Sequence, residues 1–256
     1  MADVRLNHVI DGSGPNVLLL HPVGLDVTFL KPLADCLSDR YTVMRADMRG
    51  HGGTPTHRPA TLDDLVDDIH GLIAERAFAP ATVVGMSFGG MLAQSLAVAY
   101  PHDVSALVLS TTAATFTPET RAVMEERAVT AEKGGMEAVL QDTLQRWFTP
   151  SFLGEPIVER VRDRLLADDV AGWAQTWRAI ATLDVAPRLD AIEVPTLCIA
   201  GSEDKATPPT SVRAIAERIP GAEYVEVAGA PHMLFLERPG EMARLAREFL
   251  DRTIGK

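Results

Sequence analysis

A serine stands in a glycine-flanked pentapeptide, Gly85-Met86-Ser87-Phe88-Gly89, between a β-branched apolar run and a segment with helical spacing. A strand that turns this sharply into a helix forces the serine into a strained backbone conformation. Glycines two residues before and two residues after it avoid a collision across the bend. The pattern predicts that Ser87 lies at a helix N-terminus, where free N–H groups favour developing negative charge, and that it is a nucleophile.

A serine nucleophile needs a general base and an acid that orients the base. Asp204 stands in a turn, Gly201-Ser202-Glu203-Asp204, directly after a late apolar run. His232 follows the next apolar run and is the only one of the seven histidines that comes after both Ser87 and Asp204. Glu203 is a competing carboxylate, but the Gly-x-x-Asp turn places Asp204 further round. We therefore predict that His232 is the base and Asp204 the orienting acid.

An oxyanion hole is predicted where the apolar run 17–20 leads into His21-Pro22-Val23-Gly24. A loop that leaves the carboxyl end of a central strand lies where ligands bind in open α/β sheets, and Gly24 lets the backbone turn its amides toward a ligand. We predict that the N–H groups of Val23 and Phe88 hold an oxyanion. His21 has two interpretations, a contact with substrate or simple shaping of the loop.

A second polar loop, Asp47-Met48-Arg49-Gly50-His51-Gly52, carries residue types that could be catalytic in isolation. It lies before the nucleophile in a glycine-rich turn, which favours a structural hydrogen-bond cluster. We therefore leave these residues out of the predicted site.

Apolar runs alternate with helical segments along the chain, beginning with an expected edge strand over 4–10. This alternation predicts an α/β fold with a mostly parallel, twisted sheet flanked by helices. The alternation stops over 117–184, where helical periodicity, Gly134-Gly135 and Pro150 replace it. We predict a core domain formed by 1–116 and 185–256, with a helical cap inserted at 117–184.

All three tryptophans, Trp147, Trp173 and Trp177, lie in the predicted cap. They either line a substrate pocket or pack the cap against the core. Arg146 and Arg178 stand beside tryptophans and could receive a substrate carboxylate, although arginines exposed on the surface are the more common outcome.

The composition argues against some partners. The 24 Lys and Arg residues against 35 Asp and Glu give a formal charge of −11, which disfavours binding to nucleic acid or to an anionic membrane. The uncharged stretch 77–101 is better explained as a buried strand, turn and helix than as a membrane span. No secretory signal is visible at the N-terminus, so we expect a cytoplasmic protein. Cys36 and Cys198 have no metal-ligand spacing and are predicted to be reduced core residues.

The order Ser87, Asp204, His232 matches that of the α/β-hydrolase family, which the chain resembles over essentially its whole length. Within that family it is most similar to 3-oxoadipate enol-lactonases. The narrower likeness rests on four segments: Gly89-Gly90-Met91, Arg146-Trp147-Phe148-Thr149-Pro150, Ala200 to Pro209, and Ala216 to Ala222.

The resemblance implies cleavage of a small-molecule ester or lactone through an acyl-enzyme, with no metal or organic cofactor. Two positions depart from the enol-lactonase pattern: Ala181 stands where an arginine often follows the isoleucine, and His21 stands where asparagine is more common. A broad carboxylesterase, another lactonase, a cofactor-free perhydrolase or a carbon–carbon bond hydrolase would share the catalytic residues. A ligand sensor that barely turns over is the alternative from a different functional class.

Overall fold

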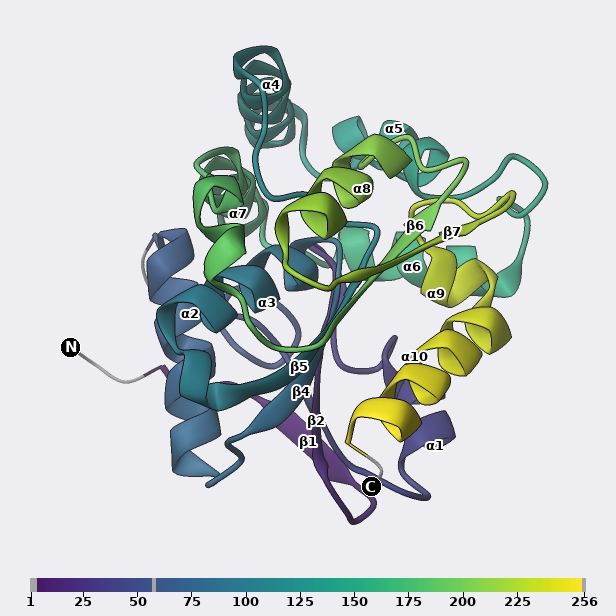
Figure 1. The fold of residues 1–256 in the computed structure, drawn as a ribbon. Helices are drawn as coiled ribbons and strands as arrows, with labels where there is room; N and C mark the ends of the chain where they lie inside the picture. The colour runs from purple at the N-terminus through teal and green to yellow at the C-terminus, as the bar shows by residue number, and fades with distance from the viewer. Residues whose placement is uncertain (1–3, 57–58, 255–256) are drawn as a thin grey trace.

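The computed structural model describes residues 4–56 and 59–254. A seven-stranded sheet with the order β1-β3-β2-β4-β5-β6-β7 forms its centre (Figure 1). β1 pairs antiparallel with β3, and every other neighbouring pair is parallel. The strands are β1 (His8–Asp11), β2 (Asn16–Leu20), β3 (Thr42–Ala46), β4 (Ala81–Met86), β5 (Val104–Ser110), β6 (Thr196–Gly201) and β7 (Glu223–Val227).

Helices cover both faces of the sheet, and the central strands are therefore buried on both sides (Figure 1). α1 and α10 pack together on one face, whereas α2, α3 and α8 lie on the other. These helices are α1 (Lys31–Leu37), α2 (Leu62–Glu75), α3 (Phe88–Ala99), α8 (Pro209–Arg218) and α10 (Pro239–Thr253), with the short α9 (Leu234–Glu237) before α10. The α/β fold predicted from the alternating pattern is confirmed.

Four helices fill the chain between β5 and the 3-10 helix Ala186–Ala191 that precedes β6: α4 (Pro118–Gly134), α5 (Glu137–Trp147), α6 (Pro156–Leu166) and α7 (Val170–Ala181). We call this group the cap. It lies above the carboxyl ends of the parallel strands (Figure 1). A bridge between Thr115 and Asp184, reinforced by a 3.0 Å side-chain hydrogen bond, joins the two chain segments at its base.

The first predicted strand is confirmed as an edge strand with other bounds, and the predicted burial of Cys36 is wrong. The edge strand expected over 4–10 begins only at His8, because the preceding backbone bonds to the loop after β3: the Asn7 N–H donates to Thr54 Oγ1 at 2.8 Å and Asn7 O accepts from the Asp47 N–H at 2.9 Å. Cys36 is exposed, because α1 buries Leu33, Ala34 and Leu37 on its other side. Cys198 is buried as expected, and burial raises the pKa of its thiol to about 12.

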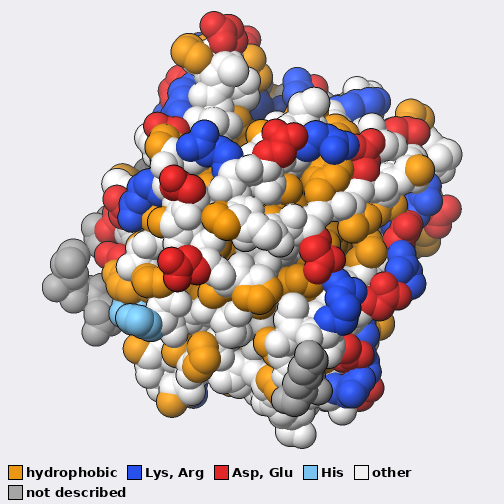
Figure 2. Space-filling model, in the orientation of Figure 1, with side chains coloured by type: hydrophobic (Ala, Val, Ile, Leu, Met, Phe, Trp, Pro, Cys, Tyr) orange, Lys and Arg blue, Asp and Glu red, His pale blue; other side chains and the backbone are white. Residues whose placement is uncertain are grey.

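Acidic and basic side chains are interspersed over the face shown in Figure 2. Several charged side chains are paired across elements of the fold, including Arg252 with Glu223 at 2.8 Å and Arg213 with Glu226 at 3.2 Å. Exposed pairs of this kind contribute little to stability, at most about 1 kcal/mol each. Within 4–56 and 59–254, none of the helices has the combination of length and apolar character that a membrane crossing needs.

Candidate active site

Ser87 occupies the sharp turn between β4 and α3. Its φ of 51° and ψ of −113° lie outside the regions that non-glycine residues normally adopt. The end of β5 holds it there: the Ser87 N–H donates to Ser110 O at 2.9 Å, and Thr112 Oγ1 donates to Ser87 O at 2.7 Å. The strained conformation is therefore fixed by two hydrogen bonds, one to the last residue of β5 and one from the segment that follows it.

The two flanking glycines allow α3 to lie directly against the sheet. A Cβ on Gly85 would stand 2.4 Å from Gly89 O, and a Cβ on Gly89 would stand 2.2 Å from Leu20 O in β2. Both distances are shorter than any side chain tolerates, and in both cases the obstacle is backbone. The turn can form only where these positions lack a side chain.

A hydrogen-bonded chain joins Ser87, His232 and Asp204, which lie in loops after three different strands. Ser87 Oγ is 2.9 Å from His232 Nε2, and His232 Nδ1 is 2.9 Å from Asp204 Oδ2. All three residues are buried, with relative exposures of 6%, 2% and 5%. Because Nδ1 faces a carboxylate, it carries the proton, and Nε2 accepts the hydrogen bond from the serine hydroxyl.

The loop after β6 fixes the carboxylate of Asp204. Oδ1 accepts the N–H groups of Ala206 and Thr207, each at 2.8 Å, and Oδ2 accepts Thr207 Oγ1 at 2.8 Å. Glu203, the competing acid, is exposed, and no hydrogen bond joins it to His232 among the described residues. Sequence reasoning did not give Thr207 a role, although Asp-x-x-Thr is a spacing at which a side chain can bond back to an acid.

Val23 lies in the loop after β2, where it is buried. Gly24 has a φ of 76°, which turns this loop, and the Leu25 N–H donates to Pro22 O at 3.3 Å. Neither the Val23 N–H nor the Phe88 N–H has an acceptor among the described residues. Phe88 is the first residue of α3, so its N–H also lies at the positive end of a helix dipole.

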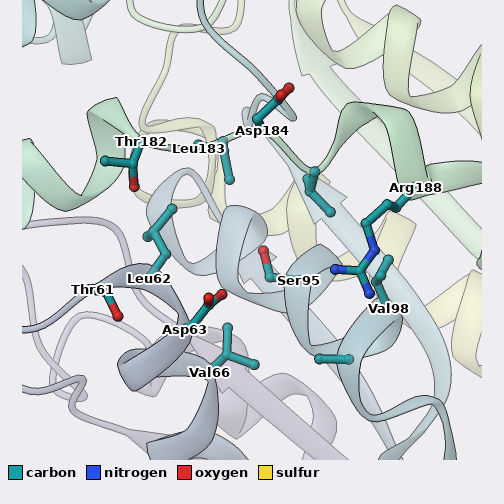
Figure 3. A pocket seen from close by; sticks show the side chains of 12 residues that line it. Thr61, Leu62, Asp63, Val66, Ser95, Val98, Thr182, Leu183, Asp184 and Arg188 are labelled. Atoms are coloured by element: carbon teal, nitrogen blue, oxygen red, sulfur yellow. The ribbon is translucent and has the colours of Figure 1, made fainter.

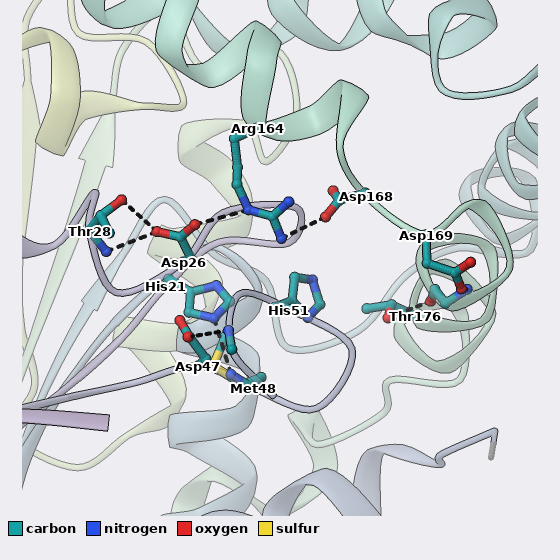
Figure 4. Close-up of polar contacts among 12 residues, drawn as sticks. His21, Asp26, Thr28, Asp47, Met48, His51, Arg164, Asp168, Asp169 and Thr176 are labelled. Atoms are coloured by element: carbon teal, nitrogen blue, oxygen red, sulfur yellow. Dashed lines mark hydrogen bonds and ion pairs between the residues drawn. The ribbon is translucent and has the colours of Figure 1, made fainter. Parts of the chain in front are cut away.

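His21 is wholly buried and uses both ring nitrogens in backbone hydrogen bonds. The Met48 N–H donates to Nε2 at 3.1 Å, so Nδ1 carries the proton and donates to Pro22 O at 2.7 Å (Figure 4). Burial lowers the pKa of His21 to about 4 and that of His51, whose ring lies 5.1 Å away, to about 3. Both rings are therefore neutral at pH 7. Of the two interpretations of His21, this geometry favours shaping of the loop.

The polar loop after β3 forms the expected hydrogen-bond cluster. Asp47 Oδ1 accepts the Val27 N–H at 2.7 Å, and Oδ2 accepts the Gly53 N–H at 2.8 Å. Arg49 pairs with Asp68 through two hydrogen bonds of 2.7 and 2.8 Å. Asp47 therefore ties the loops after β2 and β3 together.

The three tryptophans occupy different places. The Trp147 ring lies 6.4 Å from the His232 ring, and Trp147 O accepts the Met233 N–H at 2.9 Å. Trp173 Nε1 lies 3.6 Å from the point where a Cβ on Gly24 would stand. Trp177 packs on Trp173 inside the cap, with 5.6 Å between the ring centroids. Trp147 and Trp173 therefore adjoin the candidate site, whereas the environment of Trp177 is that of a packing residue.

Neither cap arginine singled out from the sequence is available to a substrate carboxylate. Arg178 donates to Glu125 and Glu132 through Nε and both terminal nitrogens, and Arg146 pairs with Asp142 at 3.0 Å. These ion pairs favour the second interpretation of Arg178 and Arg146, that of surface arginines. Arg127, which the sequence analysis did not single out, is the arginine that lies over a tryptophan of the cap: its Cζ is 5.0 Å from the centroid of the Trp177 ring.

A cleft of about 440 Å³ lies outside this constellation, between α2, α3 and the segment that leaves the cap (Figure 3). Asp63, Asp184 and Arg188 are its charged lining residues, and no serine–histidine pair lies in it. Within the described ranges, no group of three or more His, Cys, Asp or Glu side chains is placed to hold a metal ion.

Residues 17–245 match the family described as the alpha/beta hydrolase family. The chain belongs to this family. Its similar relatives include 3-oxoadipate enol-lactonase 2 of Acinetobacter baylyi, which is 31% identical over 242 residues, covering 93% of this chain and 90% of the relative. A pimeloyl-[acyl-carrier protein] methyl ester esterase of Chromobacterium violaceum is 30% identical over 250 residues, covering 94% and 96%.

A solved enol-lactonase from Burkholderia xenovorans LB400 has the same fold as this α/β hydrolase. The two superpose with a TM-score of 0.90 at 33% identity, over 96% of each chain. The predicted resemblance to α/β hydrolases and enol-lactonases is thus confirmed.

The contacts of Gly89 predict the cost of a side chain there. Gly89→Ala should lower the free energy of unfolding by about 1–3 kcal/mol or more, because the methyl group would overlap the β2 backbone. The matched control is Gly71→Ala in α2, where nothing lies within 4 Å of the new methyl group. That change should raise the free energy by about 0.5–1 kcal/mol. Denaturant unfolding measures both, and equal effects would contradict the account of the turn.

Proposed function

We propose that this α/β hydrolase is a serine hydrolase that cleaves a carboxylic ester or lactone through an acyl-enzyme. The observation that carries the proposal is the buried hydrogen-bonded chain Ser87–His232–Asp204, whose serine lies at the start of α3. The names of the relatives, enol-lactonase and methyl ester esterase, support an ester bond as the target.

In the first step, His232 Nε2 takes the proton of Ser87 Oγ as the oxygen attacks the carbonyl carbon. The carbonyl oxygen becomes an oxyanion, which the N–H groups of Val23 and Phe88 stabilise. The imidazolium then protonates the leaving oxygen. Asp204 orients the ring and stabilises its positive charge, while Thr207 and two backbone N–H groups hold Asp204 in place.

In the second step, His232 removes a proton from water, which attacks the acyl-enzyme carbonyl. A second oxyanion forms at the same two N–H groups and collapses, with the proton returned to Ser87 Oγ. The carboxylic acid leaves and the site is restored, so the protein's own residues supply every proton transfer.

For the substrate, we propose an enol-lactone, with Trp147 and Trp173 of the cap beside it. Two enol-lactonases among the similar proteins support this choice. The enol released by ring opening would tautomerise to a ketone, which makes cleavage effectively irreversible. The esterase relative favours a second candidate, a carboxylesterase of broader range.

Removal of the nucleophile tests the reaction class. Ser87→Ala should lower kcat/KM for p-nitrophenyl acetate by about 10⁴-fold or more, because no other group can form the acyl-enzyme. Ser95→Ala is the matched control: Ser95 lies on the same helix, where its Oγ donates to Met91 O at 3.0 Å. The control should retain activity within about threefold, since it takes part in no proposed step. Equal hydrolysis by wild type and Ser87→Ala would refute the proposed nucleophile.

A substrate panel separates the two candidates. An enol-lactone should have a kcat/KM at least about tenfold above a saturated γ-lactone and an ethyl ester of equal carbon number, because the rings of Trp147 and Trp173 beside the substrate would favour its planar ring. Steady-state rates for the three compounds provide the comparison. A preference for the open-chain ester would replace the lactonase assignment by the esterase one.

A further inference from the structure

Three charged side chains join the cap to the loop that carries Val23. Arg164 of α6 pairs through Nε with Asp26 Oδ2 at 2.9 Å and through a terminal nitrogen with Asp168 Oδ1 at 2.8 Å (Figure 4). Their side chains are largely buried, with relative exposures of 17% for Arg164, 13% for Asp26 and 3% for Asp168. We call this group the Arg164 bridge.

The bridge adjoins the proposed oxyanion donor. A Cβ on Gly24 would stand 2.5 Å from Leu165 Cδ2 and 3.3 Å from Asp168 Oδ2. Leu165, which follows Arg164, and Asp168 therefore lie directly beside Gly24, the residue that follows Val23. Any displacement of the end of α6 would reach the loop that positions the Val23 N–H.

Asp26 connects Arg164 to the loop after β2, because its carboxylate also accepts hydrogen bonds from Thr28 in that loop. Its Oδ1 accepts the Thr28 N–H at 2.9 Å and Thr28 Oγ1 at 2.6 Å. The next residue, Val27, is fixed by Asp47 and by Arg45, whose guanidinium donates to Val27 O at 3.0 Å. The loop is thus anchored to the sheet on one side and to the cap on the other.

Asp168 is the weakly stabilised end of the bridge. Arg164 is the only described residue that forms an ion pair with it, neither of its carboxylate oxygens accepts a hydrogen bond from a described residue, and burial raises the pKa of its carboxyl to about 7. Asp26 and Asp169 raise this pKa further and Arg164 opposes them. Across the loop lie the rings of His21 and His51, whose pKa values are lowered to about 4 and about 3, so both are neutral here.

We propose that Arg164 is a positioning residue for the oxyanion hole: by bridging Asp26 and Asp168, it holds the Val23 loop in the geometry that stabilises the oxyanion. This inference rests on the proposed acyl transfer at Ser87. The bridge is complete when Asp168 is ionised. The pKa of Asp168 in the folded protein lies above its ordinary value, so ionisation of Asp168 lowers the stability of the fold. Its contribution to the free energy of unfolding therefore falls as pH rises from about 4 to about 7.

Arg164→Met tests the position of the loop. The concentration of active sites is first measured by titration with a fluorophosphonate. The kcat for p-nitrophenyl acetate should then fall about tenfold or more, while KM changes less than about threefold. This split is expected because the lost stabilisation is confined to the transition state. Arg164→Lys should recover part of kcat. The matched control is Arg162→Met, since Arg162 lies on the same helix and pairs with Glu159 on the surface at 3.3 Å.

Asp168→Asn tests the ionised end of the bridge with little change in shape. We expect the ratio of wild-type to Asp168→Asn kcat/KM to be near one below about pH 6 and to rise several-fold above about pH 8, following ionisation of Asp168. The ratio cancels any pH dependence that the two proteins share. A merely structural role would lower activity equally at every pH.

The outcomes separate this inference from the proposed function. Suppose that wild-type activity depends on Ser87. An unchanged kcat in Arg164→Met, or a wild-type to Asp168→Asn ratio that does not change with pH, would then overturn the positioning role and leave the proposed function standing. Wild-type activity that survives Ser87→Ala would overturn the proposed function itself. The expected results are a fall in kcat in Arg164→Met, partial recovery in Arg164→Lys and a pH-dependent ratio.

Discussion

The left-handed backbone conformation of Ser87 is the constraint around which the rest of this α/β hydrolase is arranged. It exists because Gly85 and Gly89 allow β4, α3 and β2 to approach to distances that no side chain permits, and because two hydrogen bonds at the end of β5 hold it. The turn places Ser87 Oγ toward His232 and leaves the Phe88 N–H unpaired among the described residues. The proposed nucleophile and one proposed oxyanion donor thus arise from one local geometry.

The cap is fastened to the core next to two proposed catalytic groups. Near the base, Trp147 O accepts the Met233 N–H, and Thr149 donates to Glu237 through its N–H at 3.1 Å and its hydroxyl at 2.6 Å. Near the oxyanion loop, the Arg164 bridge makes the attachment. The cap therefore contacts the residue after His232 and the loop that carries Val23. We expect changes in its packing to alter the proposed reaction as well as substrate access.

Sequence reasoning succeeded where the signal is local. Buried parallel strands are continuous apolar runs, and the turn at Ser87 needs glycines at fixed offsets, so both could be predicted. Ion pairs between distant helices have no such pattern: Arg178 lies 46 and 53 residues from the glutamates that engage it, and Arg164 lies 138 residues from Asp26. His21 was ambiguous for the same reason, because its partner Met48 comes from another loop.

The central claim, that Ser87 is a nucleophile activated by His232, is tested most directly by covalent labelling. A fluorophosphonate should add one equivalent to the protein, and mass spectrometry of the digest should place it on the peptide that contains Ser87. The same treatment of His232→Gln should label at a rate lower by about 10³-fold or more. Label on another residue, or an equal rate in His232→Gln, would contradict the account.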